Sequence, residues 1–345
     1  MEKGIGISGM GRIGRLLVRA IMSNPVMRKE LKAINSTYPA ETIAHLLKYD
    51  SVHGTWDVDI QATEHSITIN ESVLQVAYSR EPEKIPWKDF GVDLVIDSTG
   101  KFNHRAGAEK HTEAGASTVL ITAPGQEMDQ TVVMGVNHQM YNPEKDRFLS
   151  AASCTTNCVV PILKVLDEAF SIKRGWVTTV HSYTSDQNHL DNPHKDLRRA
   201  RSCTQSIIPT TTGIGKALQG VFPHLASKLE GTAIRVPTED VSLLDLTIEV
   251  DRKTTVKEVK KMFIQAAEGS LAGILDWTDI PLVSTDYIGA SMSAIIDGPS
   301  VKVRGNQLKI LAWYDNEWAY ATRVMELADY IQKERYASGN LQKSS

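Results

Sequence analysis

Two cysteines stand four residues apart in the segment ASCTTNC at residues 152–158, where the pattern predicts the start of a helix. Cys154 would lie at the N-terminal edge of that helix, where the helix dipole favours a thiolate over a thiol. Cys158 follows one turn later, before two valines, and has the character of a buried apolar side chain. Most free cysteines are buried in this way, which is the alternative interpretation of Cys154. We expect one reactive thiol, Cys154, with a pKa below about 8.5, and two structural thiols, Cys158 and Cys203.

A thiolate nucleophile needs a base within hydrogen-bond reach, and His181 is the candidate. It ends a strand-like run over residues 176–181, from which its side chain can point into a cleft. His53 and His194 are among the other histidines available, and a histidine at a strand end is often only hydrogen-bonded. No further cysteine follows the 154–158 pair at metal-ligand spacing, so we expect no metal site.

A basic segment and a hydroxyl-rich turn follow this strand. The segment HKDLRRAR occupies residues 194–201, and IIPTTTG at 207–213 opens a helix-like run over 214–218. Arginine side chains and the free N–H groups of a helix N-terminus together hold phosphate well. The alternative is a solvated basic loop with interface salt bridges, and the spacing alone favours neither.

The N-terminal segment GMGRIG at 9–14 matches the pattern G-x-G-x-x-G between a predicted strand and a predicted helix. In a dinucleotide-binding βαβ unit the first glycine permits the tight turn and the second lets a pyrophosphate approach the backbone. The third glycine packs the helix on the sheet, and the helix N-terminus supplies free N–H groups to the phosphates. Glycines also serve ordinary turns, but this context favours a dinucleotide site.

The elements that must position these residues alternate between strand and helix in the first half of the chain. Strands are expected at 4–8, 31–35, 92–97 and 118–122, helices at 13–22 and 106–115, and a hairpin at 67–77. This order predicts an α/β fold with a doubly wound sheet over residues 1 to about 150.

After residue 153 the pattern changes to long alternating segments typical of an antiparallel sheet. Strands are expected at 176–181, 234–236, 241–250 and 308–314, and helices at 154–170, 256–267 and 321–333. The sequence therefore predicts a domain change near residue 150 and a frayed end over 337–345.

The composition excludes several classes of protein. The 345 residues carry a formal net charge of −3, which argues against a dedicated nucleic-acid binder. Three cysteines rule out a disulfide framework and fit a reducing, cytoplasmic location. No apolar run approaches the roughly 18 residues of a membrane span, and the N-terminus has no signal-peptide pattern. We expect small-molecule substrates and neither nucleic acid nor membrane as a partner.

An ordered set of motifs along nearly the whole chain resembles the phosphorylating glyceraldehyde-3-phosphate dehydrogenases. The motifs are GMGRIGR at 9–15, HLLKYDSVHG at 45–54, ASCTTNC at 152–158, TVH at 179–181, DNPHKDLRRAR at 191–201, IIPTTTG at 207–213, RVPT at 235–238 and WYDNEW at 313–318. The resemblance implies a Rossmann domain over 1–153, joined by a last helix over 318–345. It also implies an α+β catalytic domain over 154–317, with a mostly antiparallel sheet, and a homotetramer.

The resemblance also implies the site residues, position by position. Cys154 falls on the nucleophile and His181 on the base. The residues implied to hold the substrate and phosphate are Ser153, Thr155, Thr184, Asp186, Arg199, Thr212, Gly213 and Arg235. The candidate cofactor contacts, from the glycine pattern and the resemblance together, are Gly9, Gly11, Arg12, Ile13, Gly14, Ser36, Arg80, Thr122, Asn192 and Asn316.

Within these sets, the resemblance divides the anion contacts between two pockets. Thr184, Asp186 and Arg235 fall on the substrate phosphate pocket. Ser153, Thr212 and Gly213 fall on the inorganic-phosphate pocket, Arg199 is shared, and Asn316 falls on the contact to the nicotinamide carboxamide. The implied reaction is the reversible oxidative phosphorylation of glyceraldehyde 3-phosphate to 1,3-bisphosphoglycerate, in glycolysis or gluconeogenesis.

The end of the second strand indicates which nicotinamide cofactor is used. An NAD-selective Rossmann site places a carboxylate about 20 residues after the glycines, on the ribose 2′-hydroxyl. The run AINSTY at 33–38 contains no acid, and Ser36 stands where NAD-using relatives have aspartate. Asn192 replaces a residue that is apolar in NAD-selective relatives. We expect NADP, or both NADP and NAD, although the loss of the acid alone would leave NAD usable.

Three alternatives stay open on the sequence. Erythrose-4-phosphate dehydrogenase shares the cysteine and histidine machinery, but the complete TTTG turn at 210–213 favours the triose substrate. An acyl-phosphate reductase such as aspartate-semialdehyde dehydrogenase is disfavoured by the same turn and by RRAR at 198–201. A binding or adhesion protein on the same scaffold would be expected to have lost at least one catalytic or anion-binding residue, and none is lost.

Overall fold

The computed structural model describes residues 4–341 and divides into two compact units. The first unit comprises the chain up to Val132, residues 137–153, and the chain from Ala321 onward. The second comprises residues 133–136 and Cys154–Tyr320.

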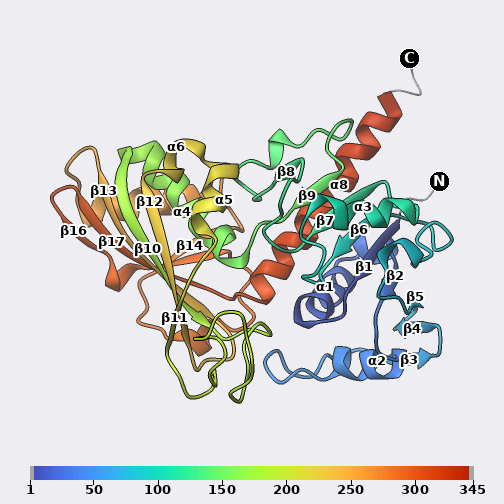
Figure 1. Cartoon of the computed structure of the whole chain (residues 1–345). Coiled ribbons are helices and arrows are strands. Elements are labelled where there is room, and N and C mark those ends of the chain that lie inside the picture. The colour runs from blue at the N-terminus through green and yellow to red at the C-terminus, as the bar shows by residue number, and fades with distance from the viewer. Residues whose placement is uncertain (1–3, 342–345) are drawn as a thin grey trace. The chain divides into compact units, whose positions relative to one another are not determined.

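The first unit is built on a sheet with nine strands among its described residues, in the order β3-β4-β5-β2-β1-β6-β7-β9-β8 (Figure 1). The strands are β1 Gly4–Ser8, β2 Leu31–Asn35, β3 Ile60–Thr63, β4 Ser66–Ile69, β5 Ser72–Ala77, β6 Val92–Asp97, β7 Thr118–Ile121, β8 Gln130–Thr131 and β9 Phe148–Ser150. The pairings from β5 to β8 are parallel, and the β3–β4–β5 meander is antiparallel. The α/β fold class and the hairpin expected near residue 70 are confirmed.

Each described helix of this unit buries apolar side chains. The helices are α1 Arg12–Ser23, α2 Ala40–Lys48, α3 Arg105–Glu113 and, from Ala321 onward, α8 Trp318–Leu341. In α1 the side chains of Leu17 and Ile21, four residues apart, are fully buried, as expected for one face of a helix on a sheet. Helix α8 continues to Leu341, so the expectation of a frayed end from residue 337 is wrong for 337–341, and residues 342–345 lie outside the described residues.

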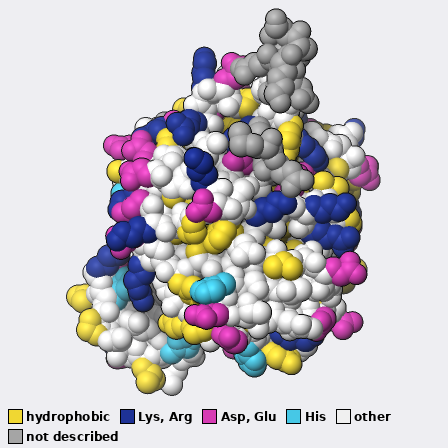
Figure 2. Space-filling view, turned by 90° about the vertical axis from the view of Figure 1, so that its right-hand side faces the viewer, with side chains coloured by type: hydrophobic (Ala, Val, Ile, Leu, Met, Phe, Trp, Pro, Cys, Tyr) yellow, Lys and Arg dark blue, Asp and Glu magenta, His cyan; other side chains and the backbone are white. Residues whose placement is uncertain are grey.

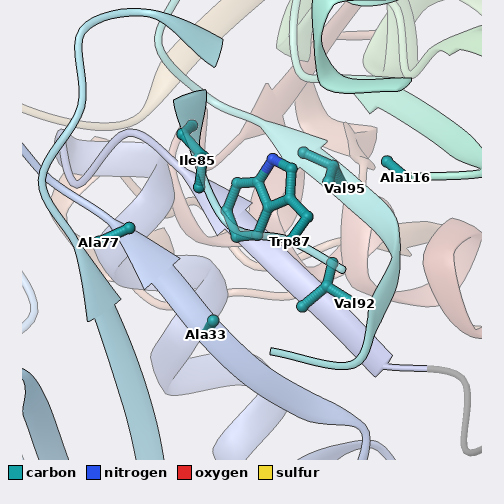
Figure 3. Close-up of a cluster of buried hydrophobic side chains, with 7 residues drawn as sticks. All are labelled: Ala33, Ala77, Ile85, Trp87, Val92, Val95 and Ala116. Carbon is teal, nitrogen blue, oxygen red and sulfur yellow. The ribbon is translucent and has the colours of Figure 1, made fainter. Parts of the chain in front are cut away.

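Trp87 is the largest side chain of a hydrophobic cluster in this unit. The cluster consists of Ala33, Ala77, Ile85, Trp87, Val92, Val95 and Ala116, all buried (Figure 3). Small residues on β2 and β5 leave room for the indole ring, which lies against Val92 and Val95 of β6. This packing fixes the loop before β6 and the first residues of that strand.

The second unit contains a sheet with eight strands among its described residues, in the order β11-β12-β10-β13-β17-β15-β14, with β16 paired to β17 (Figure 1). The strands are β10 Ile172–Ser182, β11 Ile208–Thr210, β12 Leu229–Val236, β13 Ser242–Val250, β14 Leu275–Thr278, β15 Ala294–Asp297, β16 Lys302–Arg304 and β17 Gln307–Tyr314. Its longest helices are α4 Cys154–Phe170 and α7 Val256–Glu268, and the short helices are α5 Ile214–Val221 and α6 Pro223–Ala226. Most pairings are antiparallel, as expected, but β10 pairs with β12 and β14 pairs with β15 in parallel.

The helices and the surface charge both bear on the partners expected from the sequence. Among residues 4–341, no helix combines the length and the apolar character that a membrane crossing requires. Figure 2 shows one face of the molecule, on which Lys and Arg side chains are interspersed with Asp and Glu side chains. This mixture agrees with the near-balanced net charge of −3.

Candidate active site

Cys154 is the first residue of α4, where the predicted helix begins. Two residues earlier, Ala152 has a φ of 58°, a left-handed conformation that costs a residue other than glycine about 1–3 kcal/mol. This turn precedes the helix N-terminus, and Cys154 stays partly exposed while Cys158 and Cys203 are buried. The position therefore matches a reactive thiol, and the other two cysteines match structural ones.

His181 is the penultimate residue of β10, and its side chain lies beside Cys154. Its Nε2 lies 3.4 Å from the sulfur of Cys154, and its side chain is buried. Its Nδ1 lies 2.7 Å from the carbonyl oxygen of Ser182. When Nδ1–H donates to that carbonyl, the lone pair of Nε2 faces the thiol, which is the arrangement that a general base requires.

Arg235 lies beside His181 because β10 and β12 are parallel and in register at these two residues. Its Nη1 donates to the carbonyl of Ser182 at 2.9 Å and lies 2.8 Å from Nδ1 of His181, which accepts from it only in the tautomer protonated at Nε2. In the tautomer protonated at Nδ1, the imidazole and Arg235 both donate to the Ser182 carbonyl. Burial, together with the charges of Arg235 and Arg199, lowers the pKa of His181 to about 3. The imidazole is therefore neutral at pH 7 and able to accept a proton.

The pKa of Cys154 differs from the sequence-based expectation. Burial raises the pKa of its thiol above the ordinary value, and the nearby charge of Arg235 and hydrogen bonds from Thr155 only partly oppose that effect. The expectation of a lowered pKa was wrong, because desolvation of the thiol is the largest of these effects. Reactivity then depends on transfer of the thiol proton to the neutral His181 during attack.

Tyr314, which the sequence analysis did not single out, completes this cluster. Its hydroxyl lies 3.0 Å from the hydroxyl of Thr155 and 2.8 Å from that of Thr179, and its ring packs edge-on against His181. Tyr314 thereby connects the first turn of α4 to β10 and holds the two elements that carry the thiol and the base. Its place in the WYDNEW motif at 313–318 was the available sequence pattern.

Arg199 belongs to a second polar cluster in the loop between β10 and β11. Its guanidinium pairs with Asp186 and donates to the Thr210 hydroxyl at 3.0 Å. Arg199 also lowers the pKa of Arg235, after the larger effect of burial, so the two cations lie within electrostatic range. Two nearby cations suit an anionic substrate.

Thr212 and Gly213 lie at the start of α5, whereas Thr184 and Asn192 lie in the loop that follows β10. Gly213 precedes the first residue of α5 and provides no side-chain cap, so the helix N-terminus presents backbone N–H groups beside Thr212. Thr184 accepts a hydrogen bond at its carbonyl from the N–H of Gln187. Asn192 has its N–H bonded to the carbonyl of Ala200.

Asn316 is held by two serine hydroxyls. Its Oδ1 accepts hydrogen bonds from Ser182 at 2.8 Å and from Ser242 at 2.7 Å, and all three side chains are buried. Because both hydroxyls donate to the oxygen, the amide NH₂ of Asn316 is the group left to donate to a ligand. Neither serine was identified from the sequence, where no local motif contains them both.

In the first unit, the glycine segment forms a tight turn from β1 into α1. Gly9 has a φ of 95°, and a Cβ at Gly14 would lie 1.9 Å from the carbonyl oxygen of Gly9. A Cβ at Gly11 would have no neighbour within 4 Å in the described chain, so this position is open to a ligand. Helix α1 has no side-chain cap at Gly11, which leaves its first N–H groups for an anion. The turn fits the pyrophosphate of a dinucleotide.

A cavity of about 360 Å³ extends from this turn along the carboxyl ends of the strands. Its lining is Ser8, Gly9, Met10, Gly11, Arg15, Asn35, Ser36, Thr37, Tyr38, Ile43, Leu46, Ser79, Arg80, Pro82, Ile85, Ser98, Thr99, Lys101 and Phe102. This set, taken within the described chain, contains three cations and no carboxylate. Arg12 begins α1 and pairs with Asp50, and Thr122 follows β7 with its N–H bonded to the carbonyl of Asp97.

Two family models match the chain. The model of the glyceraldehyde 3-phosphate dehydrogenase C-terminal domain matches residues 153–316, and that of the NAD binding domain of the same enzyme matches residues 3–105. This chain belongs to the glyceraldehyde 3-phosphate dehydrogenase family. The expectation drawn from the motifs is therefore confirmed, and so is the Rossmann character of the first unit.

Relatives in the glyceraldehyde 3-phosphate dehydrogenase family align with almost the whole chain. Glyceraldehyde-3-phosphate dehydrogenase 2 of Bacillus subtilis is 49% identical over 332 residues, which are 96% of this chain and 97% of the relative. Glyceraldehyde-3-phosphate dehydrogenase 1 of Bacillus cereus is 51% identical over 328 residues, 95% of this chain and 98% of the relative. The enzyme of Geobacillus stearothermophilus is 50% identical over 95% of this chain and 97% of its own length. The chain is an oxidoreductase that uses a nicotinamide cofactor.

Proposed function

We propose that Cys154 and His181 carry out the phosphorylating oxidation of glyceraldehyde 3-phosphate, the glycolytic reaction of this family. The observation that supports this most directly is the 3.4 Å separation between the Cys154 sulfur and Nε2 of a neutral, buried His181. As the sulfur adds to the aldehyde carbon, its proton passes to Nε2, and the carbonyl oxygen then takes that proton to give a thiohemiacetal. The backbone N–H of Cys154 and His181 stabilise the charge on that oxygen.

Oxidation needs the same imidazole a second time. His181 takes the thiohemiacetal hydroxyl proton as the carbon–hydrogen bond breaks, and the product on Cys154 is a thioester. The nicotinamide ring, when bound, accepts the hydride. Inorganic phosphate then attacks the thioester carbon, the carbon–sulfur bond breaks, and Cys154 is released with 1,3-bisphosphoglycerate as the product.

Two anion pockets would hold the phosphates. Arg235 and the Arg199–Asp186 pair supply the cations for the substrate phosphate, together with Thr184. The start of α5, with Thr212 and Gly213, would hold inorganic phosphate through its N–H groups, together with Ser153. On the amide orientation fixed by its two serines, Asn316 would bind the nicotinamide carboxamide.

The cofactor is proposed to be NADP, or NADP and NAD together. Ser36 accepts the N–H of Tyr38 at 3.0 Å, so its hydroxyl proton is free to donate to a 2′-phosphate. Arg80 and Lys101 line the same cavity and could pair with the 2′-phosphate. The run AINSTY at 33–38 contains no cation of its own. The assay with both cofactors, described next, tests this assignment.

Phosphate-dependent reduction of NADP and of NAD, with glyceraldehyde 3-phosphate and in parallel with erythrose 4-phosphate, tests the function. We expect the triose to be preferred and Cys154→Ser to abolish turnover, with Cys203→Ser as the matched control on a buried thiol. His181→Asn is expected to lower kcat by about 10²–10⁴-fold, the usual contribution of a general base. Turnover without phosphate, or a preference for erythrose 4-phosphate, would contradict the proposal.

The family also supports a homotetramer, and the three free thiols fit a reducing cytoplasm. Analytical ultracentrifugation of the purified chain tests the first statement. A sedimenting species of about four chain masses is expected, and a stable monomer would contradict it.

A further inference from the structure

A chain of buried hydrogen bonds connects the Trp87 cluster to the wall of the dinucleotide cavity. The indole Nε1–H of Trp87 donates to Nδ1 of His111 in α3 at 3.1 Å. Nε2 of His111 lies 2.9 Å from Oδ2 of Asp97, the last residue of β6. All three side chains are buried, and Figure 3 shows the indole nitrogen on the edge of the ring that points away from Val92.

The donors and acceptors in this chain allow one arrangement. An indole N–H donates and never accepts, so Nδ1 of His111 must accept. A neutral imidazole with Nδ1 as the acceptor carries its proton on Nε2, and this proton is donated to the Asp97 carboxylate. Trp87 therefore fixes the tautomer of His111, and His111 fixes Asp97.

The other oxygen of Asp97 shapes the cavity wall. Oδ1 accepts the N–H of Thr99 at 2.8 Å and the hydroxyl of Thr99 at 2.6 Å. The Thr99 hydroxyl in turn accepts the N–H of Lys101 at 3.1 Å. Thr99, Lys101 and Phe102 all line the cavity, and Phe102 also packs edge-on against His111.

This wall is held against the glycine turn on its other side. Ser98 donates to the carbonyl of Gly9 at 2.7 Å, and a Cβ at Gly9 would lie 2.8 Å from the N–H nitrogen of Thr99. The segment 97–102 is therefore in contact with the pyrophosphate turn, and a rotation of the Asp97 carboxylate would move both.

We propose that Trp87 and His111 are positioning residues for the cofactor, which act through Asp97 to set the adenosine side of the dinucleotide cavity. The inference rests on the cofactor site proposed above. It concerns residues that the cofactor does not touch, because neither Trp87 nor His111 lines the cavity. Its distinctive consequence is that the tautomer of a buried histidine controls dinucleotide affinity.

The test uses the full-length protein with Asp97→Asn, Trp87→Phe, the double variant, and Leu74→Ala as a control. Leu74 is buried in β5 of the same unit, outside both the network and the cavity lining. Titration calorimetry with ADP-ribose, with its 2′-phosphorylated form and with nicotinamide mononucleotide gives the affinity for each half of NAD and of NADP. Thermal unfolding and kcat at saturating cofactor are measured in parallel.

Asp97→Asn places an N–H donor where His111 also donates, or where Thr99 donates, so one donor–donor contact is unavoidable. The Kd for ADP-ribose should rise by about tenfold or more, in line with a lost hydrogen bond to a charged group. The Kd for nicotinamide mononucleotide and kcat should stay within about twofold. Leu74→Ala should lower Tm without changing the Kd for ADP-ribose.

The double variant distinguishes a positioning role of Trp87 and His111 from destabilisation of the fold. Once the indole N–H is gone, His111 can move its proton to Nδ1 and accept from the new amide at Nε2. We expect Trp87→Phe to restore part of the ADP-ribose affinity that Asp97→Asn loses, although it lowers Tm further. Additive losses of affinity, or an equal loss in Leu74→Ala, would overturn the inference. If the wild-type protein binds neither ADP-ribose nor its 2′-phosphorylated form, that result would instead overturn the cofactor site itself.

Discussion

Arg235 and His181 are direct neighbours in the parallel β10–β12 ladder, and a guanidinium nitrogen lies 2.8 Å from the imidazole Nδ1. A cation in contact with a base opposes its protonation, so the residue expected to bind a substrate phosphate also sets the charge of the base. On the proposed mechanism, Arg235 couples recognition of an anion to proton transfer. When an anion neutralises Arg235, the imidazole should become more basic.

Arg235→Leu should move the acid limb of the pH–rate profile to higher pH. The pKa of His181, about 3, is lowered first by burial and then by Arg235, so removing this charge raises the pKa and protonates the base at a higher pH. The measurement is kcat/KM against pH with unphosphorylated glyceraldehyde, which does not depend on binding a substrate phosphate. Arg235→Lys keeps the charge and should keep the wild-type limb. An unshifted limb in Arg235→Leu would refute this coupling.

Cys154 should be the first thiol to react with iodoacetamide, and its alkylation should abolish activity. Cys158 and Cys203 are buried, whereas Cys154 is partly exposed and next to His181. Since burial raises the pKa of Cys154, its rate of alkylation should increase as the pH rises above neutrality. Mass spectrometry of partially inactivated protein gives the modified site. Inactivation that tracks Cys158 or Cys203 would exclude this assignment.

Ser36→Asp should shift the cofactor preference toward NAD. The new carboxylate would repel a 2′-phosphate and would accept from a free 2′-hydroxyl, in a cavity whose described lining holds cations and no carboxylate. We expect kcat/KM for NADP to fall by about tenfold or more, while that for NAD changes less. Ser36→Asn serves as the uncharged control. A wild-type preference for NAD above about tenfold, worth roughly 1.4 kcal/mol, would argue against the NADP assignment.

Thr212→Ala and Arg235→Leu should separate the two anion pockets. Removing the Thr212 hydroxyl beside the start of α5 should mainly raise the KM for inorganic phosphate. Removing Arg235 should mainly raise the KM for the phosphorylated aldehyde, by an amount consistent with a charge-assisted contact of about 1.5–3 kcal/mol. Steady-state kinetics with each substrate varied in turn measures both. Identical losses for aldehyde and phosphate in the two variants would mean one shared pocket.

Asp240→Asn should make the protein more stable at alkaline pH. Burial and the charges of Asp315 and Glu317 raise the pKa of Asp240 to about 8. Between about pH 4 and pH 8 the folded state holds a proton that the unfolded state has released, so stability falls as the pH rises through this window. The difference in Tm between variant and wild type should therefore grow from pH 5 to pH 9. The exposed Asp57→Asn is the control, and a pH-independent difference would exclude Asp240 as its source.

The hydrophobic periodicity of the sequence predicted the strands and helices that form from short-range patterns. The strands at 4–8, 31–35 and 92–97 and the helix at 154–170 lie where the periodicity placed them. Helix α2 was missed, although Ile43 and Leu47 form a buried stripe four residues apart and Pro39 marks its start. Strands β14 and β15 have four residues each, too few for a period of two to be distinguished from a loop.

The contacts within the candidate active site could not be predicted from local sequence patterns. The contact between His181 and Arg235 depends on the register of two strands joined by a long connection, and that of Tyr314 with Thr155 joins residues 159 positions apart. No sequence motif spans either of these separations along the chain. The pKa of Cys154 was misjudged for the same reason: the helix N-terminus is visible in the sequence, but the atoms that desolvate the thiol are not.

Helix α8 belongs, from Ala321 onward, to the unit that begins at the N-terminus, and it buries Val324, Leu327 and Ile331 there. A ribosome makes the N-terminal strands first and this helix only after the entire second unit has been synthesised. The dinucleotide-binding unit therefore cannot complete its core until the chain has grown past the second unit. Its earliest strands must wait, with an apolar surface uncovered, until this helix has been made. A prematurely terminated chain would lack that cover and should be cleared as an aggregation-prone fragment rather than persist as a separate cofactor-binding domain.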